Sequence, residues 1–206
     1  MLLLVVFVLS ASSCREKKAD ATQTVTDPTG NTEKVMWNGY TKIAAQEIEG
    51  NIIKNLEDNW MLITAGGPDS YNTMTASWGG LGEIWSTPVS FITVRNTRFT
   101  YGFLQNNDYY TLTFFGGAEK EAMHYLGSNS GRDGDKIAKT GLTPMETPLG
   151  CMSFEQATMI LECKKLYEDE LDPKSIFDDQ IAGDYLKNNE RHVMFFGEIV
   201  NVWVKK

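Results

Sequence analysis

The sequence contains few of the residues that bind metals or form covalent intermediates. Only two of its 206 residues are histidines, His124 and His192, and only three are cysteines. No HExxH segment and no pair of CxxC segments occurs, so a catalytic or structural zinc site of the common kinds is not expected. GxSxG and a GxGxxG segment after a strand are also missing, which argues against an α/β-hydrolase and a Rossmann fold.

Positive charge is also scarce. Lys and Arg number 19 and Asp and Glu number 27, which gives a net charge of −8. Such an acidic chain does not present the broad basic face that binds nucleic acids or anionic membranes. We therefore expect no nucleic-acid partner. A small basic pocket remains compatible with this charge, because two or three cations are enough to bind one phosphate group.

The chain opens with an apolar segment that differs from everything after it. Residues 1–14, MLLLVVFVLSASSC, are apolar up to a group of small residues and Cys14. No Lys or Arg lies before the apolar run. The segment is shorter than a membrane-spanning helix and is typical of a secretory signal. Small residues directly before a cysteine resemble the cleavage site of a bacterial lipoprotein, so Cys14 is the expected lipidation site. The alternatives are a plain signal peptide, or a cytoplasmic protein whose leader is not a signal.

Residues 15–36 are expected to form a disordered tether between this anchor and the domain. Residues 15–34 contain one β-branched aliphatic residue, Val25, and no aromatic residue. This apolar surface is too small to offset the entropy lost on folding. We expect contact with the membrane only through the lipid, and a single folded domain at 37–206. The composition, with 42% hydrophobic and 22% charged residues, is typical of a soluble globular domain.

Two cysteines remain in the domain, Cys151 and Cys163. Outside the cytoplasm they can form a disulfide. They can equally be two buried thiols, and the sequence leaves both states open.

Apolar runs of strand length dominate the domain. Strands are expected at 60–65, 72–78, 88–94, 109–115, 158–167 and 192–204. Helices fit best at 98–105, at 119–126 and after residue 132. Many strands with few, short helices favour a mainly β fold, a β-barrel with helical insertions, over a doubly wound sheet.

One strand and one helix start suit a phosphorylated ligand. In 72–78, NTMTASW, alternation places Thr73, Thr75 and Ser77 on one face and Met74, Ala76 and Trp78 on the other. An ordinary amphipathic strand has the same pattern. In 95–100, RNTRFT, Thr97 is the expected N-cap of a helix, with Arg95 and Arg98 beside it. A helix start with nearby arginines favours phosphate, although a capped helix with solvated arginines is the alternative.

A third segment has the composition of an anion-binding loop. Residues 128–136, SNSGRDGDK, contain Gly131 and Gly134, which favour a flexible loop. Arg132 and Lys136 are four residues apart and share a face if a helix begins there. The segment is therefore either a clamp over a bound anion or a solvated turn.

Together these segments resemble one known family. In this order, NTMTASWGG, RNTRFT, GSNSGRDGDK and the C-terminal HVMFFGEIV are similar to the flavin reductase-like, flavoredoxin-like branch of the FMN-binding split-barrel superfamily, over residues 40–204. The resemblance implies a six-stranded split barrel of Greek-key type. It also implies a homodimer with FMN at the subunit interface.

The resemblance assigns site residues as well. It places the flavin against Asn72, Thr73, Met74, Thr75, Ala76 and Ser77, and the phosphate on Arg95, Thr97, Arg98 and Thr100. Ser130, Gly131, Arg132 and Lys136 would close over the cofactor. His192 lies where related proteins place a histidine near the nicotinamide or the flavin, and it is the candidate catalytic residue. An ordinary strand histidine is equally compatible with its position.

The implied activity is that of an NAD(P)H-dependent flavin reductase, in which a hydride passes to flavin N5 and the reduced FMN supplies a second acceptor. Two other functions stay open. One is an FMN-containing electron-transfer protein that exchanges electrons with a redox protein partner. The other is a surface-binding lipoprotein on a flavin-free barrel. Bound flavin separates the last from the first two, and flavin reduction by NAD(P)H separates those two from each other.

We predict that Cys14→Ala releases the protein from the membrane. In cells that express the wild type, the protein should sediment with membranes and incorporate labelled palmitate, because several acyl chains on one cysteine anchor a protein firmly. The variant should lose the label. A wild-type protein that is soluble, unlabelled and retains Met1 would contradict the prediction and favour a cytoplasmic location.

Overall fold

The computed structural model describes residues 23–25, 34–187 and 191–205. The leader 1–14, including Cys14, lies outside these residues, as does most of the expected tether. Within the described segments, no helix has the length and apolar character that crossing a membrane requires.

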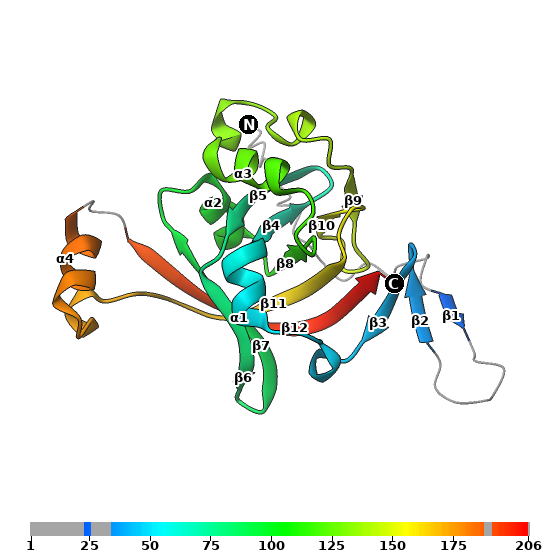
Figure 1. The fold of residues 1–206 in the computed structure, drawn as a ribbon, viewed down its shortest axis with the longest axis horizontal. Helices are drawn as coiled ribbons and strands as arrows, with labels where there is room; N and C mark the ends of the chain where they lie inside the picture. Colours follow the sequence, from blue (N-terminus) through cyan, green and yellow to red (C-terminus); the bar gives the residue numbers. More distant parts are fainter. Residues whose placement is uncertain (1–22, 26–33, 188–190, 206) are drawn as a thin grey trace, which may run out of the picture.

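The described chain is mainly β, as the sequence predicts. The strands are β1 (Gln23–Val25), β2 (Lys34–Trp37), β3 (Tyr40–Ile43), β4 (Met61–Gly67), β5 (Ser70–Ala76), β6 (Gly79–Ile84), β7 (Thr87–Arg95), β8 (Tyr109–Phe114), β9 (Pro144–Glu146), β10 (Met152–Phe154), β11 (Met159–Glu170) and β12 (His192–Lys205). The helices are α1 (Ile52–Lys54), which continues as a π-helix at Asn55–Asn59, α2 (Phe99–Asn106), α3 (Lys120–Ser128) and α4 (Asp179–Lys187). Short 3-10 turns lie at Ala45–Glu47, Gly131–Asp133, Ile137–Lys139 and Pro173–Ser175. Figure 1 labels these elements.

Antiparallel pairing closes the central strands into a barrel. β5 pairs with β4, and β4, β8, β11 and β12 pair in that order. β12 then pairs with β7, and β7 pairs with β6. β5 runs almost directly into β6, and Thr93 N–H of β7 donates to the carbonyl of Trp78 between them (3.2 Å). The β5–β6 segment therefore joins both ends of the sheet, and the predicted barrel fold is confirmed.

The core has two layers because β4 and β8 are buried on both faces. Met61, Ile63 and Leu112 point into the barrel, where α2 contributes Leu104. The opposite face of β4 packs through Leu62 against an outer layer formed by α3 and the β9–β10 region. In Figure 1, α2 and α3 lie at the same end of the barrel as β4 and β5. This end carries the cavities described below.

A bulge in β12 lets this strand change neighbours. Along one edge β12 pairs with β11 throughout, but its other edge pairs first with β7 and then with β3. The register with β11 shifts between Glu162 and Cys163, which leaves Val200 of β12 as the extra residue at the change of neighbour. Beside the bulge, the buried Glu162 carboxylate accepts hydrogen bonds from Asn201 Nδ2 (2.8 Å) and Trp203 Nε1 (2.7 Å).

The expected elements are present, except that one helix is replaced by single turns, and the structure adds elements that were not predicted, among them β3, β6, β9, β10 and α4. All six expected strands are confirmed as β4, β5, β7, β8, β11 and β12, and the helices expected at 98–105 and 119–126 as α2 and α3. The helix expected after residue 132 consists of single turns at Gly131–Asp133 and Ile137–Lys139. β6 was not predicted, because its three glycines hide the strand pattern. Within the segment expected to be a tether, β1 pairs with β2, and β2 pairs with β3.

Of the two states left open for the cysteines, the structure has the reduced one. Cys151 and Cys163 are both buried, neither forms a disulfide, and they belong to different apolar clusters. Burial raises the pKa of the Cys163 thiol to about 12. This thiol accepts a hydrogen bond from Ser90 Oγ (3.3 Å) and is a packing residue rather than a nucleophile.

We predict that Glu162→Gln destabilises the fold strongly. Besides the two side chains of β12, the backbone N–H of Leu149 donates to this carboxylate (2.8 Å), and an amide group presents its own N–H donors to one or more of these three partners. Urea unfolding should show a loss of about 2–4 kcal/mol. Glu83→Gln, at an exposed position of β6, is the control and should change stability by less than about 0.5 kcal/mol. Equal effects would show that the buried carboxylate does not hold the bulge.

Candidate functional site

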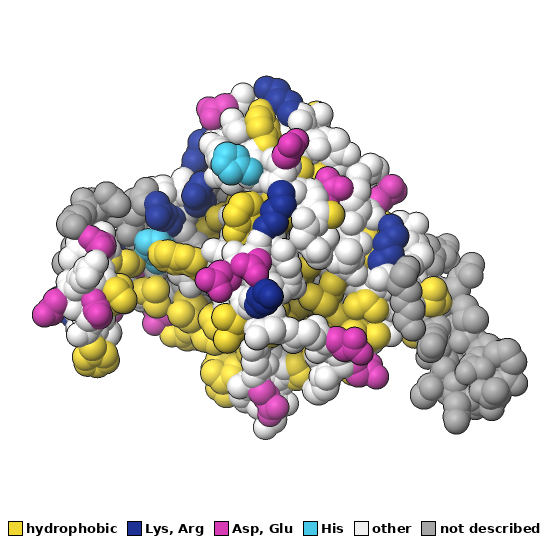
Figure 2. Space-filling model, viewed as in Figure 1, with side chains coloured by type: hydrophobic (Ala, Val, Ile, Leu, Met, Phe, Trp, Pro, Cys, Tyr) yellow, Lys and Arg dark blue, Asp and Glu magenta, His cyan; other side chains and the backbone are white. Residues whose placement is uncertain are grey.

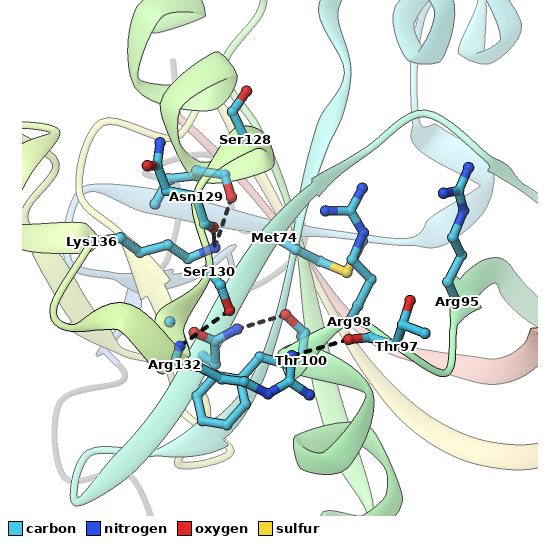
Figure 3. A pocket seen from close by; sticks show the side chains of 14 residues that line it. Met74, Arg95, Thr97, Arg98, Thr100, Ser128, Asn129, Ser130, Arg132 and Lys136 are labelled. Carbon is cyan, nitrogen blue, oxygen red and sulfur yellow. Dashed lines mark hydrogen bonds between the residues drawn. The ribbon is translucent and has the colours of Figure 1, made fainter. Parts of the chain in front are cut away.

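A cavity of about 350 Å³ opens where the start of α2 faces β5 and the loop after α3 (Figure 3). It gathers three segments that are far apart in the sequence. The lining residues are Asn72, Met74, Arg95, Thr97, Arg98, Phe99, Thr100, Leu126, Ser128, Asn129, Ser130, Gly131, Arg132 and Lys136. We call it the cationic cavity, because this lining includes four cations and no carboxylate.

The start of α2 forms one wall of the cationic cavity. The N-cap is Arg98 rather than the predicted Thr97, because Arg98 N–H donates to the carbonyl of Arg95 (3.0 Å) and closes a turn before the helix begins. Thr100 is buried, and its hydroxyl accepts a hydrogen bond from Asn72 Nδ2 (2.7 Å), which ties α2 to β5. The N–H groups and the positive end of the helix dipole therefore face the cavity, an arrangement that favours an anion.

The loop after α3 forms the opposite wall. Arg132 donates to the carbonyl of Thr97 (3.0 Å), and its guanidinium lies over the ring of Phe99, 5.1 Å from the centroid. Gly131 packs so closely that a Cβ there would lie 2.2 Å from Asn72 Oδ1 and 2.9 Å from Phe99 Cδ1. Only glycine fits this approach, so the loop and its arginine are held against α2 and β5 (Figure 3).

Lys136 is the buried cation of the cavity. Its Nζ donates to the carbonyls of Leu126 (2.7 Å) and Asn129 (3.0 Å), the first in the last turn of α3 and the second just beyond it. Burial, and then the charge of nearby Arg98, lower the pKa of Lys136 to about 8. An anion in the cavity would stabilise the protonated ammonium and raise this pKa again.

A second cavity of about 220 Å³ continues from the first along β5. It shares Met74, Arg95 and Arg98 with the cationic cavity, and Thr75, Ala76, Ser77, Trp78, Thr93 and His192 complete its lining. We call it the aromatic cavity. Trp78 is 58% exposed and stacks on the ring of His192, with centroids 5.2 Å apart and planes at 26°. The two cavities therefore form one continuous site, charged at one end and aromatic at the other.

The position of His192 is fixed from two sides. Arg95 Nε donates to His192 Nε2 (3.2 Å), so a neutral imidazole here carries its proton on Nδ1. The hydroxyl of Tyr185 accepts a hydrogen bond from the backbone N–H of His192 (2.9 Å) and donates to the carbonyl of Leu171 (3.1 Å). The ring of His192 is thus held at the edge of the aromatic cavity, between the rings of Trp78 and of Tyr185 in α4.

The structure brings nearly all of the predicted residues to this site. Among them, the cationic cavity is lined by Asn72, Met74, Arg95, Thr97, Arg98, Thr100, Ser130, Gly131, Arg132 and Lys136, and the aromatic cavity by Met74, Thr75, Ala76, Ser77, Arg95, Arg98 and His192. Thr73 lies in neither lining. It is fully buried, and its hydroxyl bonds to Thr64 Oγ1 (2.9 Å) and the carbonyl of Ile63 (3.3 Å) of β4.

The hydroxyl face of β5 serves the fold more than the cavity. The Thr75 hydroxyl donates to the carbonyl of Met123 in α3, as that of Thr73 bonds to β4. The opposite face carries Asn72 and Met74 into the cationic cavity. The alternation of β5 was interpreted as the sign of a hydroxyl-lined site. In the structure, the hydroxyls of Thr73 and Thr75 instead bond to neighbouring elements of the two-layered core.

Six residues that line the two cavities were not predicted from the sequence, namely Trp78, Thr93, Phe99, Leu126, Ser128 and Asn129. Trp78 is the most informative of these, since the alternation of β5 placed it on an apolar face, yet two glycines follow it and leave its ring exposed. Ser128 and Asn129 line the cationic cavity beside the predicted Ser130. Both lie in the polar segment 128–136 after α3. Within that segment, the prediction of an anion clamp rested only on Arg132 and Lys136.

Comparisons with known proteins agree with this architecture. The family model described as "Flavin reductase like domain" matches residues 54–206. No curated protein matches the chain. The chain is similar to the solved structures of an FMN-binding domain of a flavin reductases-like enzyme from Shewanella baltica OS155 (17% identity, 76% of this chain and 75% of that chain, TM-score 0.55) and of flavoredoxin from Desulfovibrio vulgaris (22%, 72% and 70%, 0.55).

It is also similar to an FMN-binding protein from Thermus thermophilus, solved with p-hydroxybenzaldehyde bound, at 23% identity over 80% of this chain and 81% of that chain, with a TM-score of 0.55. At these identities the structural likeness shows a common fold. Its coverage includes most of both chains, so the barrel is shared as a whole rather than in a fragment.

We predict that anion binding to the cationic cavity weakens as the pH rises through about 8. Lys136 binds an anion in its protonated form, and the pKa of its ammonium is about 8 before an anion is bound. Sulfate, which does not titrate in this range, should therefore lose up to about tenfold in affinity between pH 7 and pH 9. In Lys136→Met the pH dependence should disappear, whereas the exposed control Lys139→Met should keep it. A flat profile for the wild type would remove Lys136 from the anion site.

Proposed function

The chain belongs to the family of flavin reductase-like domains, and we propose that it binds FMN and uses it to accept a hydride from NAD(P)H. The observation that carries the proposal is the continuous site. One end has four cations and a helix start for a phosphate dianion, and the other end is lined by a strand and by aromatic side chains. FMN has the same division, a phosphate at one end and a planar ring at the other.

The phosphate end would be held by the residues of the cationic cavity. Arg98 is shared by both cavities, and Arg132 closes the cavity from the loop side. Guanidinium groups present several N–H donors in a plane and match phosphate oxygens well. Lys136 and the start of α2 complete the electrostatic environment. These residues of the cationic cavity would therefore suit the phosphate group of FMN.

The ring end would lie along β5 and beside Trp78. Bound flavin supplies the redox chemistry, and the protein supplies its orientation and the exclusion of water. Residues 74–78 line this cavity, and the polar edge of such a ring would lie beside them. His192, held by Arg95, lies within reach of the same cavity and is the residue that we assign to proton transfer there.

The purified full-length protein tests this function directly. It should show a visible flavin spectrum, the extracted cofactor should be FMN rather than FAD, and NADH or NADPH should bleach the flavin under anaerobic conditions. A flavin that is bound but not reduced by either nucleotide would identify an electron-transfer protein served by a redox partner. A colourless protein that cannot be reconstituted would leave the barrel without a flavin function.

We also propose that the protein is a homodimer. Trp85 and Tyr167 are 61% and 44% exposed, and their rings lie 6.4 Å apart. The ring of Tyr167 also lies 6.0 Å from that of Phe196, and Phe196 lies 6.1 Å from Phe91, so the four rings run from the β6–β7 turn over β11, β12 and β7. Figure 2 shows hydrophobic side chains gathered over this part of the molecule. Aromatic residues of this kind are enriched in interfaces, and light scattering should give twice the monomer mass.

The proposed location is outside the cytoplasm, on a lipid attached to Cys14. The support comes from the apolar leader and the small residues before this cysteine. An extracytoplasmic flavoprotein would draw its electrons from a partner or a diffusible reductant when NAD(P)H is scarce.

We predict that Arg98→Ala weakens FMN far more than riboflavin. The lost contact is to the phosphate, and a charge-assisted hydrogen bond is worth about 1.5–3 kcal/mol, which is about ten- to a hundredfold in affinity. Binding is measured by quenching of flavin fluorescence for both ligands. Arg191→Ala is the matched control, because Arg191 pairs with Glu170 outside both cavities (3.0 Å) and should leave both affinities unchanged. Equal weakening of FMN and riboflavin in Arg98→Ala would assign this arginine to the ring or the fold.

A further inference from the structure

The segment between β11 and β12 carries α4 outside the barrel. It leaves β11 after Glu170 and returns to β12 at His192, and its described part includes the turn Pro173–Ser175 and α4. We call residues 171–187 the α4 arm. Figure 1 shows α4 standing away from the barrel at the far end of these two strands. The α4 arm therefore approaches the aromatic cavity at the point where β12 begins.

Tyr185 is the residue of α4 that reaches back to the barrel. It is half-buried, and its ring centroid lies 5.0 Å from that of His192, with the planes at 38°. The ring of Trp78 lies 5.2 Å from the same imidazole. The imidazole of His192 thus contacts two aromatic rings, one from the wall of the aromatic cavity and one from the α4 arm.

The hydroxyl of Tyr185 occupies the place of a β-ladder hydrogen bond. In one kind of antiparallel pair, the two opposite residues exchange two N–H···O bonds. The N–H of Leu171 donates to the carbonyl of His192 (2.9 Å), which is the first of these bonds. In place of the second, the N–H of His192 donates to the hydroxyl of Tyr185 (2.9 Å), and this hydroxyl donates to the carbonyl of Leu171 (3.1 Å). The hydroxyl is therefore inserted between the two strand ends.

This insertion sets how far the start of β12 lies from β11. A direct ladder bond would join the two groups at about 2.9 Å. Here two bonds in series, of 2.9 and 3.1 Å, connect them. At its other edge, β12 pairs with β7 through His192 and Arg95, and Arg95 Nε donates to His192 Nε2 (3.2 Å). Tyr185 and Arg95 thus hold His192 from opposite edges of the same strand.

We infer that Tyr185 is a positioning residue for the proton transfer assigned to His192, and that its inserted hydroxyl keeps the imidazole at the aromatic cavity. The inference rests on the proposed function, which places the flavin ring in that cavity. Tyr185 lines neither cavity, so it acts through His192. Without the hydroxyl, the buried N–H of His192 needs another acceptor, and the carbonyl of Leu171 is the nearest in the ladder. Their direct bond would draw the start of β12 toward β11 and the imidazole away from Arg95.

The kinetic test compares Tyr185→Phe with the control Tyr125→Phe in the full-length, FMN-loaded protein. Each variant removes one hydroxyl from a half-buried tyrosine of a helix and keeps the ring, and Tyr125 in α3 lines neither cavity. At saturating NADH or NADPH, Tyr185→Phe should lower kcat about ten- to a hundredfold, because a misplacement of about 1 Å can cost a factor of about a hundred. KM and the affinity for FMN should stay unchanged. Tyr125→Phe should match the wild type, and a wild-type kcat in Tyr185→Phe overturns the inference.

A double-mutant cycle shows whether Tyr185 acts through His192. His192→Gln alone should lower kcat. In that background, Tyr185→Phe should change kcat by less than about twofold, because two residues that act as one unit do not give additive losses. A further ten- to hundredfold loss in the double variant would show that the tyrosine acts independently of the histidine, and it overturns the inference.

Nitrogen NMR of the imidazoles gives a readout that does not depend on turnover. The chain has only two histidines, so ¹⁵N-labelled histidine gives two sets of imidazole signals, and His124→Gln assigns them. In the wild type and in Tyr125→Phe, the neutral ring of His192 should carry its proton on Nδ1, because Nε2 accepts from Arg95. In Tyr185→Phe the share of this tautomer should fall, while the signals of the exposed His124 stay in place.

Unchanged His192 signals in Tyr185→Phe overturn the inference whatever the kinetics show. Failure of the proposed function is read separately, from the absence of flavin absorbance or of flavin reduction by either nucleotide. In that case the same NMR comparison of Tyr185→Phe with Tyr125→Phe, made on the protein as purified, decides whether the tyrosine positions the histidine.

Discussion

The arrangement of this protein depends on the bulge at Val200, where β12 exchanges one neighbour for another. Before the bulge β12 completes the barrel with β7, and after it the same edge pairs with β3. The buried Glu162 carboxylate holds the strand at this point through Asn201 and Trp203. A buried acceptor with three N–H donors is costly to disturb, so the position of the exchange is strongly specified. The bulge therefore determines how the residues of β12 that precede it pair with β7.

The site follows from that geometry. The first residue of β12, His192, pairs with Arg95, the last residue of β7, and this contact places the histidine and the arginine at one rim of the barrel. β7 ends there because a turn leads into α2, whose start faces the cationic cavity. Strand β5 forms the remaining wall and is fixed by hydrogen bonds to both α2 and α3. The site is therefore assembled from element ends that the barrel brings together, which is where binding residues of rigid scaffolds commonly lie.

The charge of the chain and the charge of the site have opposite signs. A net charge of −8 coexists with a cavity lined by four cations, because no carboxylate of the described residues lines that cavity. Burial strengthens the effect, since it lowers the pKa of Lys136 to about 8 and makes an incoming anion the most favourable partner of its ammonium. Arg98 and Arg132 also line a third cavity, of about 550 Å³, on the other side of α2.

The sequence by itself determined the mainly β fold, the six long strands and most of the residues that line the two cavities. Apolar runs such as that of β4 are strong local signals, and RNTRFT and SNSGRDGDK contain the arginines, lysine and glycines of the cavity. It did not determine β6, whose glycines carry no pattern, or the use of the Thr73 and Thr75 hydroxyls, which face neighbouring elements of the core. Nor could it place Trp78 on His192, or join Arg98 and Arg132 across 34 residues of chain. Only tertiary structure decides such contacts, because local periodicity fixes which face a side chain occupies but not what packs against that face.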